Sequence, residues 1–303
     1  MSAQANAKTP GEPLLRIGIL GLDTSHCEAF TRLLNNESDP WHVPGGRVVC
    51  AWPGGSDDIP LSRERVGGFT TILREEFAVE ILETPEAVAG QVDALMVAAL
   101  DARIHPELVE RIGTFGKPVF VDKPLALTEA AGRTMFEKTK GLPLFSCSSL
   151  RFAAAWTETF ENMGGDDVLG ADIHAPLSLE ATQPGYSWYG IHGVEMLLSA
   201  MGPGFRSVSL HSAGDHEILV ADWSDGRIGS VRFNRGGKHQ FGGVIHSAES
   251  SRFCVVNNHP RPLYGPLIEE VIRFFQTGRA PVTAAETLEV LRFIDSANHC
   301  RLS

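Results

Sequence analysis

The sequence predicts an α/β fold with a doubly wound parallel sheet, followed by an α+β domain with a predominantly antiparallel open sheet. Three observations predict it. The first part of the chain alternates short apolar runs with helical segments, which is typical of parallel strands buried on both faces. One such run, Val119 to Val121, stops at Asp122-Lys123-Pro124, because proline cannot continue a central ladder. The stretch from Phe205 to Val256 reads as successive strands joined by turns.

The first strand is expected at Leu14 to Leu20, followed by the turn Gly21 to His26 and a helix with Phe30, Leu33 and Leu34 on one face. A strand, a tight turn and a helix open a mononucleotide-binding unit. Further strands are expected at residues 48–52, 79–82, 94–100 and 119–121, with helices between them. Residues 14–125 are therefore predicted to form a Rossmann-type dinucleotide-binding domain.

The rest of the chain has a different pattern. Thr128 caps a helix that Gly141 ends, a strand follows at 142–147, and a helix is expected over 151–163. Five more strands are expected at 208–211, 217–223, 227–233, 240–246 and 253–256. Two helices close the chain, and the second begins with the capping box Thr283 to Glu286. Residues 126–303 are predicted to form an α+β domain for substrate binding and oligomerisation.

Composition excludes several classes of protein. The 303 residues suffice for two domains, and 43% hydrophobic with 21% charged residues is ordinary for a globular protein. A net charge of −11 without a basic cluster argues against a nucleic-acid partner. No apolar run approaches the roughly 20 residues that span a bilayer. We expect residues 1–13 to be a disordered leader and the protein to be cytoplasmic. The five scattered cysteines form no Cys-x-x-Cys, so no metal site is predicted.

Lys123 is the first candidate for chemistry. It follows a buried strand, at the edge where open α/β sheets bind ligands. A long, flexible amine there can hold a phosphate, a hydroxyl or a carbonyl oxygen. The plain alternative is an Asp-Lys pair in an ordinary turn between a strand and a helix.

The second candidate is the stretch from Tyr186 to Leu198. A helix from Gly190 places His192 and Glu195 on one face. Histidine exchanges a proton near neutral pH, and Glu195 could orient its ring or raise its pKa. The aromatic residues that precede this helix suit a wall for a planar or sugar-like ligand; they are Tyr186, Trp188 and Tyr189. The alternative is a solvated His-Glu pair on a surface helix.

Together these features resemble the glucose–fructose oxidoreductase / inositol dehydrogenase / MocA family of oxidoreductases, as a divergent member. Asp122-Lys123-Pro124 stands where the family has Glu-Lys-Pro, and Gly190-Ile191-His192 is followed by an acid at Glu195. Further matching segments are His105, Ser149 to Phe152, Phe274 to Gly278, and Pro281-Val282. The resemblance covers nearly the whole chain after residue 13.

The resemblance implies an NAD(P)-dependent dehydrogenase that transfers hydride between a nicotinamide and a sugar, cyclitol or related hydroxy compound in an interdomain cleft. Lys123 would hold the substrate hydroxyl and His192 would be the general acid/base, with Glu195 and Tyr189 as further catalytic candidates. The implied substrate contacts are Lys123, Arg151, Trp188, Tyr189 and His192. The implied cofactor contacts are Gly21, Leu22, Asp23, Thr24, Ser25, His26, Ala99, Leu100, Asp101, His105, Asp122 and Lys123. It also implies a homodimer or homotetramer, because the family packs its open sheets face to face.

The phosphate loop departs from the Gly-x-Gly-x-x-Gly pattern, since its key positions read Gly21, Asp23 and His26. A carboxylate at the second position would repel phosphate at close range. Pro53 replaces the acid that ends the second strand, which leaves NAD and NADP open. Trp188 stands where the family has an aspartate. These departures favour an alternative: a member without a redox role, either a ligand-binding sensor or a lyase or hydrolase.

Overall fold

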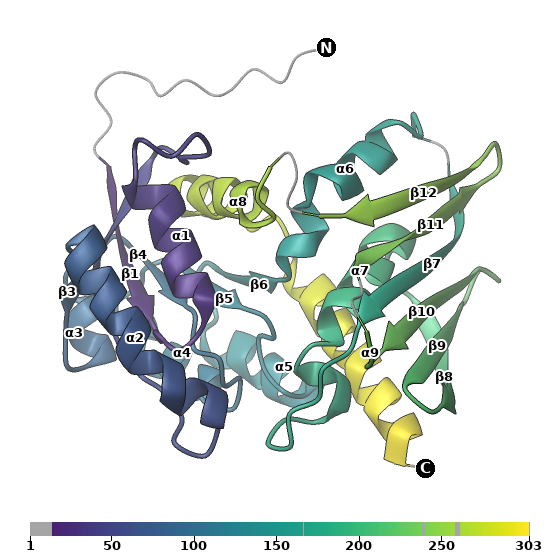
Figure 1. The fold of residues 1–303 in the computed structure, drawn as a ribbon, viewed down its shortest axis with the longest axis horizontal. Coiled ribbons are helices and arrows are strands. Elements are labelled where there is room, and N and C mark those ends of the chain that lie inside the picture. Colours follow the sequence, from purple (N-terminus) through teal and green to yellow (C-terminus); the bar gives the residue numbers. More distant parts are fainter. Residues whose placement is uncertain (1–13, 166, 238–239, 258–260, 303) are drawn as a thin grey trace.

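The computed structural model describes residues 14–165, 167–237, 240–257 and 261–302, so the predicted leader 1–13 lies outside the described residues. Two sheets stand side by side, each with its own helices (Figure 1). The predicted division into a parallel sheet and a mostly antiparallel sheet is confirmed.

The first sheet is a doubly wound parallel sheet with the strand order β3-β2-β1-β4-β5-β6. Chain order reverses between β1 and β4, which is where ligands bind at the carboxyl ends of the strands. The last strand lies beyond the boundary expected at residue 125. The strands are β1 (Leu15–Leu20), β2 (Gly46–Trp52), β3 (Glu80–Ile81), β4 (Ala94–Val97), β5 (Val119–Asp122) and β6 (Leu144–Cys147).

Three of the connecting helices begin at a threonine cap, and the cap at Thr128 was expected from the sequence. Thr24, Thr84 and Thr128 each accept a backbone N–H in the first turn of a helix. Gly21 has φ +96°, and a Cβ there would lie 2.4 Å from the backbone of Ala99, so the turn after β1 requires glycine. The helices are α1 (Ser25–Asn35), α2 (Pro60–Phe77), α3 (Pro85–Ala89), α4 (His105–Gly113) and α5 (Glu129–Lys138).

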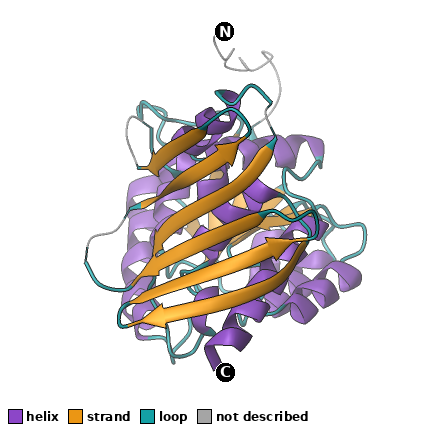
Figure 2. Cartoon of the chain, turned by 90° about the vertical axis from the view of Figure 1, so that its right-hand side faces the viewer, coloured by secondary structure: helices purple, strands orange, loops and turns teal. Residues whose placement is uncertain are grey.

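The second sheet has the order β12-β11-β7-β10-β9-β8. Its central strand β7 was not expected from the sequence; it pairs in parallel with β10 and antiparallel with β11. In Figure 2 the strands lie in front, with the helices mainly behind them, so one face of this sheet is open. The strands are β7 (Val168–Pro176), β8 (Phe205–Ala213), β9 (His216–Trp223), β10 (Ile228–Asn234), β11 (Phe241–Ser247) and β12 (Ser251–Val256).

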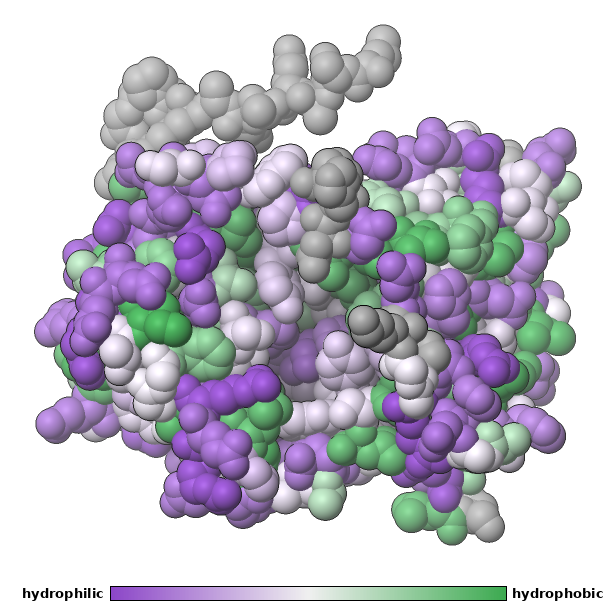
Figure 3. All heavy atoms as spheres, viewed as in Figure 1, coloured by the Kyte–Doolittle hydropathy of each residue, from purple (hydrophilic) through white to green (hydrophobic). Residues whose placement is uncertain are grey.

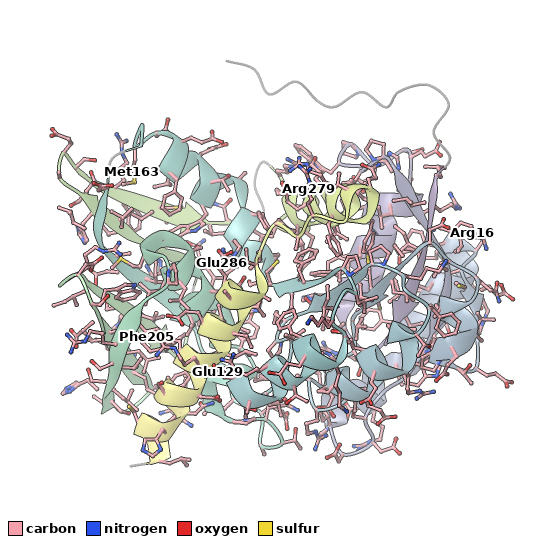
Figure 4. The ribbon with its side chains drawn as sticks, turned by 180° about the vertical axis from the view of Figure 1, so that it is seen from behind. Arg16, Glu129, Met163, Phe205, Arg279 and Glu286 are labelled. Atoms are coloured by element: carbon pink, nitrogen blue, oxygen red, sulfur yellow. The ribbon has the colours of Figure 1, made fainter. Side chains whose placement is uncertain are left out.

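The remaining helices join the two halves. The helix expected over 151–163 is split, because Ala153 takes an extended ψ of 131°. Helix α8 returns to pack on the first sheet through Leu267 and Val271. Helix α9 runs along the seam between the sheets, with Glu286 in its first turn and Glu129 of α5 beside it (Figure 4). The elements are η1 (Ser149–Phe152), α6 (Ala154–Glu161), η2 (Gly185–Ser187), α7 (Ile191–Met201), α8 (Tyr264–Thr277) and α9 (Ala284–Leu302).

None of the helices in the described residues is both long and apolar enough to cross a membrane.

Candidate active site

The carboxyl end of β5 faces the start of α7, and Lys123 lies between them. Its Nζ donates to the backbone oxygen of Trp188 at 3.5 Å, across the seam between the halves. The space-filling view shows the molecule hollowed at this seam (Figure 3). Burial lowers the pKa of the Lys123 amine, and the Asp122 carboxylate raises it in part. The structure therefore places a desolvated amine at the seam between the two halves, after the carboxyl end of β5.

His192 enters the same region from the second half. It is 8% exposed, and its Nδ1 lies 2.7 Å from the hydroxyl of Ser148. Burial holds the pKa of His192 well below its usual value, and the charges of Lys123 and His26 lower it further. The ring of Tyr189 lies edge-on, 5.1 Å from that of His192 between centroids. His192 and Tyr189 thus lie together beside Lys123.

Glu195 does not orient His192, so that expectation is wrong. Its carboxylate accepts from the backbone N–H of Ser148 at 2.8 Å and from Nε of Arg151 at 3.1 Å. Arg151 also donates to Glu286 at 3.1 Å. One turn of α7 does carry both His192 and Glu195, but the two side chains bind different partners. Glu195 and Arg151 therefore form a buried ion pair behind the cleft. The Arg151 guanidinium binds two carboxylates of the protein and is not free to bind a substrate.

His26 and Asp122 form a close pair at the other side of Lys123. Nδ1 of His26, in the first turn of α1, is 2.5 Å from Oδ2 of Asp122. The Tyr264 ring packs 4.9 Å from the His26 ring. Burial raises the pKa of Asp122, but His26 and Lys123 outweigh it and lower the pKa below its ordinary value. His26, expected from the sequence as a cofactor contact, is therefore paired with Asp122 in the structure.

Two residues of this site were missed from the sequence. Ser148 directly precedes Ser149 to Phe152, a segment that carries the family resemblance. Tyr264 is the first residue of α8 and lies 141 residues after Lys123 in the chain. Neither position belongs to a motif, so only the folded chain brings them to the cleft. Conversely, Tyr186 was expected to line the ligand site, but its side chain is fully buried and its hydroxyl donates a hydrogen bond to Glu217.

Asp23 turns away from the phosphate position. It is 0% exposed; the hydroxyl of Ser62 donates to its Oδ2 at 2.6 Å and the N–H of Leu100 to its Oδ1 at 2.9 Å. Burial raises the pKa of Asp23, against these hydrogen bonds. The expectation that Asp23 would repel a phosphate is therefore wrong. Its carboxylate instead links the turn after β1 to α2 and to the loop after β4.

The loops after β2 and β4 are joined to each other. Asp101 is 1% exposed and accepts from the hydroxyl of Ser56 at 2.8 Å, and also from Gln183 at 2.9 Å. Arg103 bridges Asp101 to Asp58 with contacts of 2.7 Å to each. Burial raises the pKa of Asp101, but the hydrogen bonds outweigh it and lower the pKa to about 2. The two loops are therefore held by charged hydrogen bonds.

The predicted cofactor contacts divide into buried and accessible residues. A dinucleotide on a sheet of this order lies across the carboxyl edge, with its pyrophosphate at the first helix and its ribose at the end of the second strand. His105 is fully buried, and both of its ring nitrogens face backbone oxygens at 2.8 Å. Ser25 is exposed at the start of α1. The other contacts that are buried are Gly21, Leu22, Asp23, Thr24, Ala99, Asp101 and Asp122. The predicted contacts that keep exposed surface at this edge are Ser25, His26, Leu100 and Lys123.

Among the described residues, no group of three or more histidine, cysteine or acidic side chains is placed to hold a metal ion.

Comparisons with known proteins place the fold. The sequence matches no family model and no curated protein. The structure is similar to that of GenD2 from gentamicin A biosynthesis in complex with NAD, with 16% identity, a TM-score of 0.78, and 99% of this chain and 98% of that chain covered. It is similar to scyllo-inositol dehydrogenase from Lactobacillus casei with bound NAD(H) and scyllo-inositol, with 12% identity, a TM-score of 0.75, and coverage of 95% and 97%. For myo-inositol 2-dehydrogenase from Lactobacillus plantarum the identity is 15%, the TM-score 0.75, and the coverage 96% and 97%. The resemblance seen in the sequence is confirmed in the fold, which is that of inositol dehydrogenases and related oxidoreductases of the glucose–fructose oxidoreductase / inositol dehydrogenase / MocA type.

Proposed function

We propose that the protein is an enzyme that acts on a hydroxyl or carbonyl group of a small, carbohydrate-like compound in the interdomain cleft. The observation that carries this proposal is that Lys123 and His192 lie near each other, so that the charge of Lys123 acts on His192. They come from different halves of the chain, and both are desolvated at the carboxyl end of β5. Proton-transferring groups with pKa values shifted by burial in a cleft are characteristic of functional sites.

Each residue has a role that follows from its contacts. Lys123 donates a hydrogen bond to the reacting oxygen of the substrate, since its amine reaches the backbone oxygen of Trp188 only at 3.5 Å. His192 exchanges the proton of that oxygen. Because Ser148 engages Nδ1, Nε2 is the ring nitrogen that remains for the ligand. Tyr189 and Trp188 form the wall of the site beside His192, and Tyr189 also offers a hydroxyl to the substrate.

In the first version of this function the enzyme is an NAD- or NADP-dependent oxidoreductase. The fold it shares with dehydrogenases solved with NAD(H) and an inositol supports this version, and supports a polyhydroxylated substrate. A bound nicotinamide would supply the hydride acceptor or donor, while Lys123 and His192 would handle the proton.

In the second version the cleft performs the same proton transfers without net redox change, or only binds its ligand. The closed arrangement of Asp23, Ser62, Asp101 and Arg103 favours this version, because it covers the surface a dinucleotide would contact.

One experiment separates the versions and tests the site. The purified protein is titrated with NAD(H) and NADP(H) by fluorescence, and is then assayed against a panel of inositols, aldoses and ketoses. Lys123→Ala is expected to abolish turnover, while Lys138→Ala, a lysine paired on the surface with Glu110, retains it. Unchanged turnover in Lys123→Ala would remove Lys123 from the mechanism.

We propose further that two copies associate through the open face of the second sheet. Ile228 of β10 and Phe253 of β12 are 57% and 68% exposed there, and large exposed apolar side chains on one face are typical of an interface. Light scattering on Ile228→Asp compared with the wild type tests this, because a charge introduced on this face would be buried in the interface of both copies.

A further inference from the structure

The carboxyl edge of the first sheet is crossed by three contacts between the protein's own side chains: Asp23 with Ser62, Asp101 with Ser56, and His26 with Asp122. We infer that these contacts close the groove in which this fold holds a dinucleotide, and that the cleft is a proton-transfer site for a hydroxy-carbonyl compound that works without a nicotinamide cofactor. The proton-transfer half of this inference rests on the proposed roles of Lys123 and His192.

The first contact lies within the turn that, in a dinucleotide-binding fold, approaches the pyrophosphate. In the dinucleotide loop the second glycine leaves space for the backbone to approach the phosphates. Here that position is Asp23, whose carboxylate lies inside the protein and is bonded on both oxygens. Turning it outward would leave Ser62 and the N–H of Leu100 without their acceptor, and an unpaired buried group is costly. The contact is therefore a stable part of the fold.

The second contact covers the place of the adenosine. The ribose and adenine belong between the loops that follow β2 and β4. Ser56 and Asp101 join these two loops at 2.8 Å, and Arg103 spans the same gap to reach Asp58. Gln183, from the second half of the chain, adds a hydrogen bond to Asp101. A nucleoside would have to break this charged network to reach the edge of the sheet.

The third contact closes the route toward Lys123. The third glycine of the loop normally allows close packing of the first helix, and here it is His26. Its ring reaches across to Asp122 at the end of β5 and packs against Tyr264. Trp188 and Tyr189 line the cleft beside Lys123 and keep part of their surface accessible. The space at Lys123 therefore suits a small ligand.

Proton transfer within a hydroxy-carbonyl compound needs no electron acceptor. A base removes the proton from the carbon that bears the hydroxyl, and the electron pair of that C–H bond forms the double bond of an enediol. The carbonyl oxygen takes up a proton, and the enediol is then reprotonated on the neighbouring carbon while the other oxygen loses its proton. Atoms and electrons balance, and the product is an isomer. Lys123 holds the oxygen that gains charge, and His192 carries the proton.

The closure is tested by nucleotide binding. The wild type is expected to show no saturable fluorescence change with NADH or NADPH up to about 1 mM. The double variant Asp23→Gly/Ser62→Ala is expected to gain binding by at least about tenfold, which is about 1.4 kcal/mol. The matched control is Asp222→Gly/Ser207→Ala, a serine–aspartate pair of 2.8 Å on the second sheet, and it should gain nothing. If the double variant fails to fold, Arg103→Ala tests the same closure, because it removes the partly exposed side chain that links Asp101 to Asp58.

Micromolar binding of either nucleotide by the wild type would overturn the closure and would support the redox version of the proposed function. If Asp23→Gly/Ser62→Ala and Arg103→Ala bind nucleotide no better than the wild type, these contacts are not what excludes a dinucleotide.

The proton-transfer half is tested by NMR in D₂O without nucleotide, with aldoses and ketoses as probes. The wild type is expected to exchange carbon-bound hydrogen for deuterium, and Lys123→Ala to lose at least about tenfold of that rate. Absence of exchange with every probe would overturn proton transfer at this site while leaving the binding result to stand alone.

Discussion

Nδ1 of His26 lies 2.5 Å from Oδ2 of Asp122, which joins the first turn of α1 to the end of β5. In a dinucleotide-binding sheet these two places face the cofactor, but here they face each other. Lys123 follows Asp122 directly, so the pair also forms one border of the cleft. The same contact therefore explains both the position of the candidate active site and the difficulty of placing a dinucleotide beside it.

The first prediction concerns stability at this contact. Asp122→Asn is expected to lower the free energy of unfolding at pH 7 by about 2 kcal/mol, because a charge-assisted hydrogen bond becomes a neutral one. The folded-state pKa of Asp122 is lowered, so its contribution is complete above its unfolded value of about 3.9 and is lost as the pH falls through the folded value. Urea unfolding of both proteins at pH 7 and at steps from about pH 4 to about pH 2 measures this. A difference that grows on acidification would contradict it.

The second prediction concerns Asp101, whose pKa is lowered to about 2. Asp101→Asn is expected to destabilise the protein at neutral pH, and the difference from the wild type should shrink as the pH falls from about 4 toward the folded value. The reason is that the wild-type carboxylate then becomes protonated and loses its charged bonds to Arg103. Thermal unfolding across this pH range checks the trend. Asp57→Asn, an exposed neighbour, is the control and should show no such trend.

Much of this fold could be predicted from the sequence, because its signals are local. The apolar runs, the cap at Thr128 and the capping box at Thr283 define elements that the structure contains. Strand β7 was missed because Gly170, Asp172 and His174 alternate on its open face and interrupt the apolar pattern. The place of Lys123 directly after β5 follows from the sequence, because the proline that comes next ends the strand.

The partners of the site residues could not be predicted in the same way. Helical spacing correctly placed His192 and Glu195 one turn apart, but it carries no information on what each side chain meets. Ser148 reaches His192 over 44 residues of chain, and Asp23 reaches Ser62 over 39. Such contacts depend on the packing of loops, and the general expectation that a carboxylate in a phosphate loop faces phosphate was therefore wrong for Asp23.

The third prediction separates structure from catalysis at Glu195. Glu195→Ala is expected to cost about 3–5 kcal/mol of stability, because it leaves the buried Arg151 with only Glu286 as a charged partner. Chemical unfolding measures this loss. Glu195→Gln keeps the shape and one acceptor, and should cost less. Activity per folded molecule should stay near the wild-type value in Glu195→Gln, and a pH profile shifted in that variant would instead show that Glu195 acts on His192.

The last prediction concerns Ser148, which we place as a positioning residue for His192. Ser148→Ala removes the hydrogen bond to Nδ1 and is expected to lower kcat/KM by about tenfold through the loss of one ring orientation. Burial and neighbouring positive charge hold the pKa of His192 below its usual value, so the neutral ring persists as the pH falls below about 6.5. The acidic limb of the activity profile should therefore lie below that pH in the wild type. In Ser148→Ala the limb should move, because the hydroxyl no longer fixes the tautomer, and Ser148→Thr should restore both rate and profile. The matched control is Ser199→Ala: Ser199 lies on α7 with His192, but its hydroxyl binds Trp156. A Ser148→Ala enzyme with reduced rate but an unmoved pH profile would indicate a purely structural role for this hydroxyl.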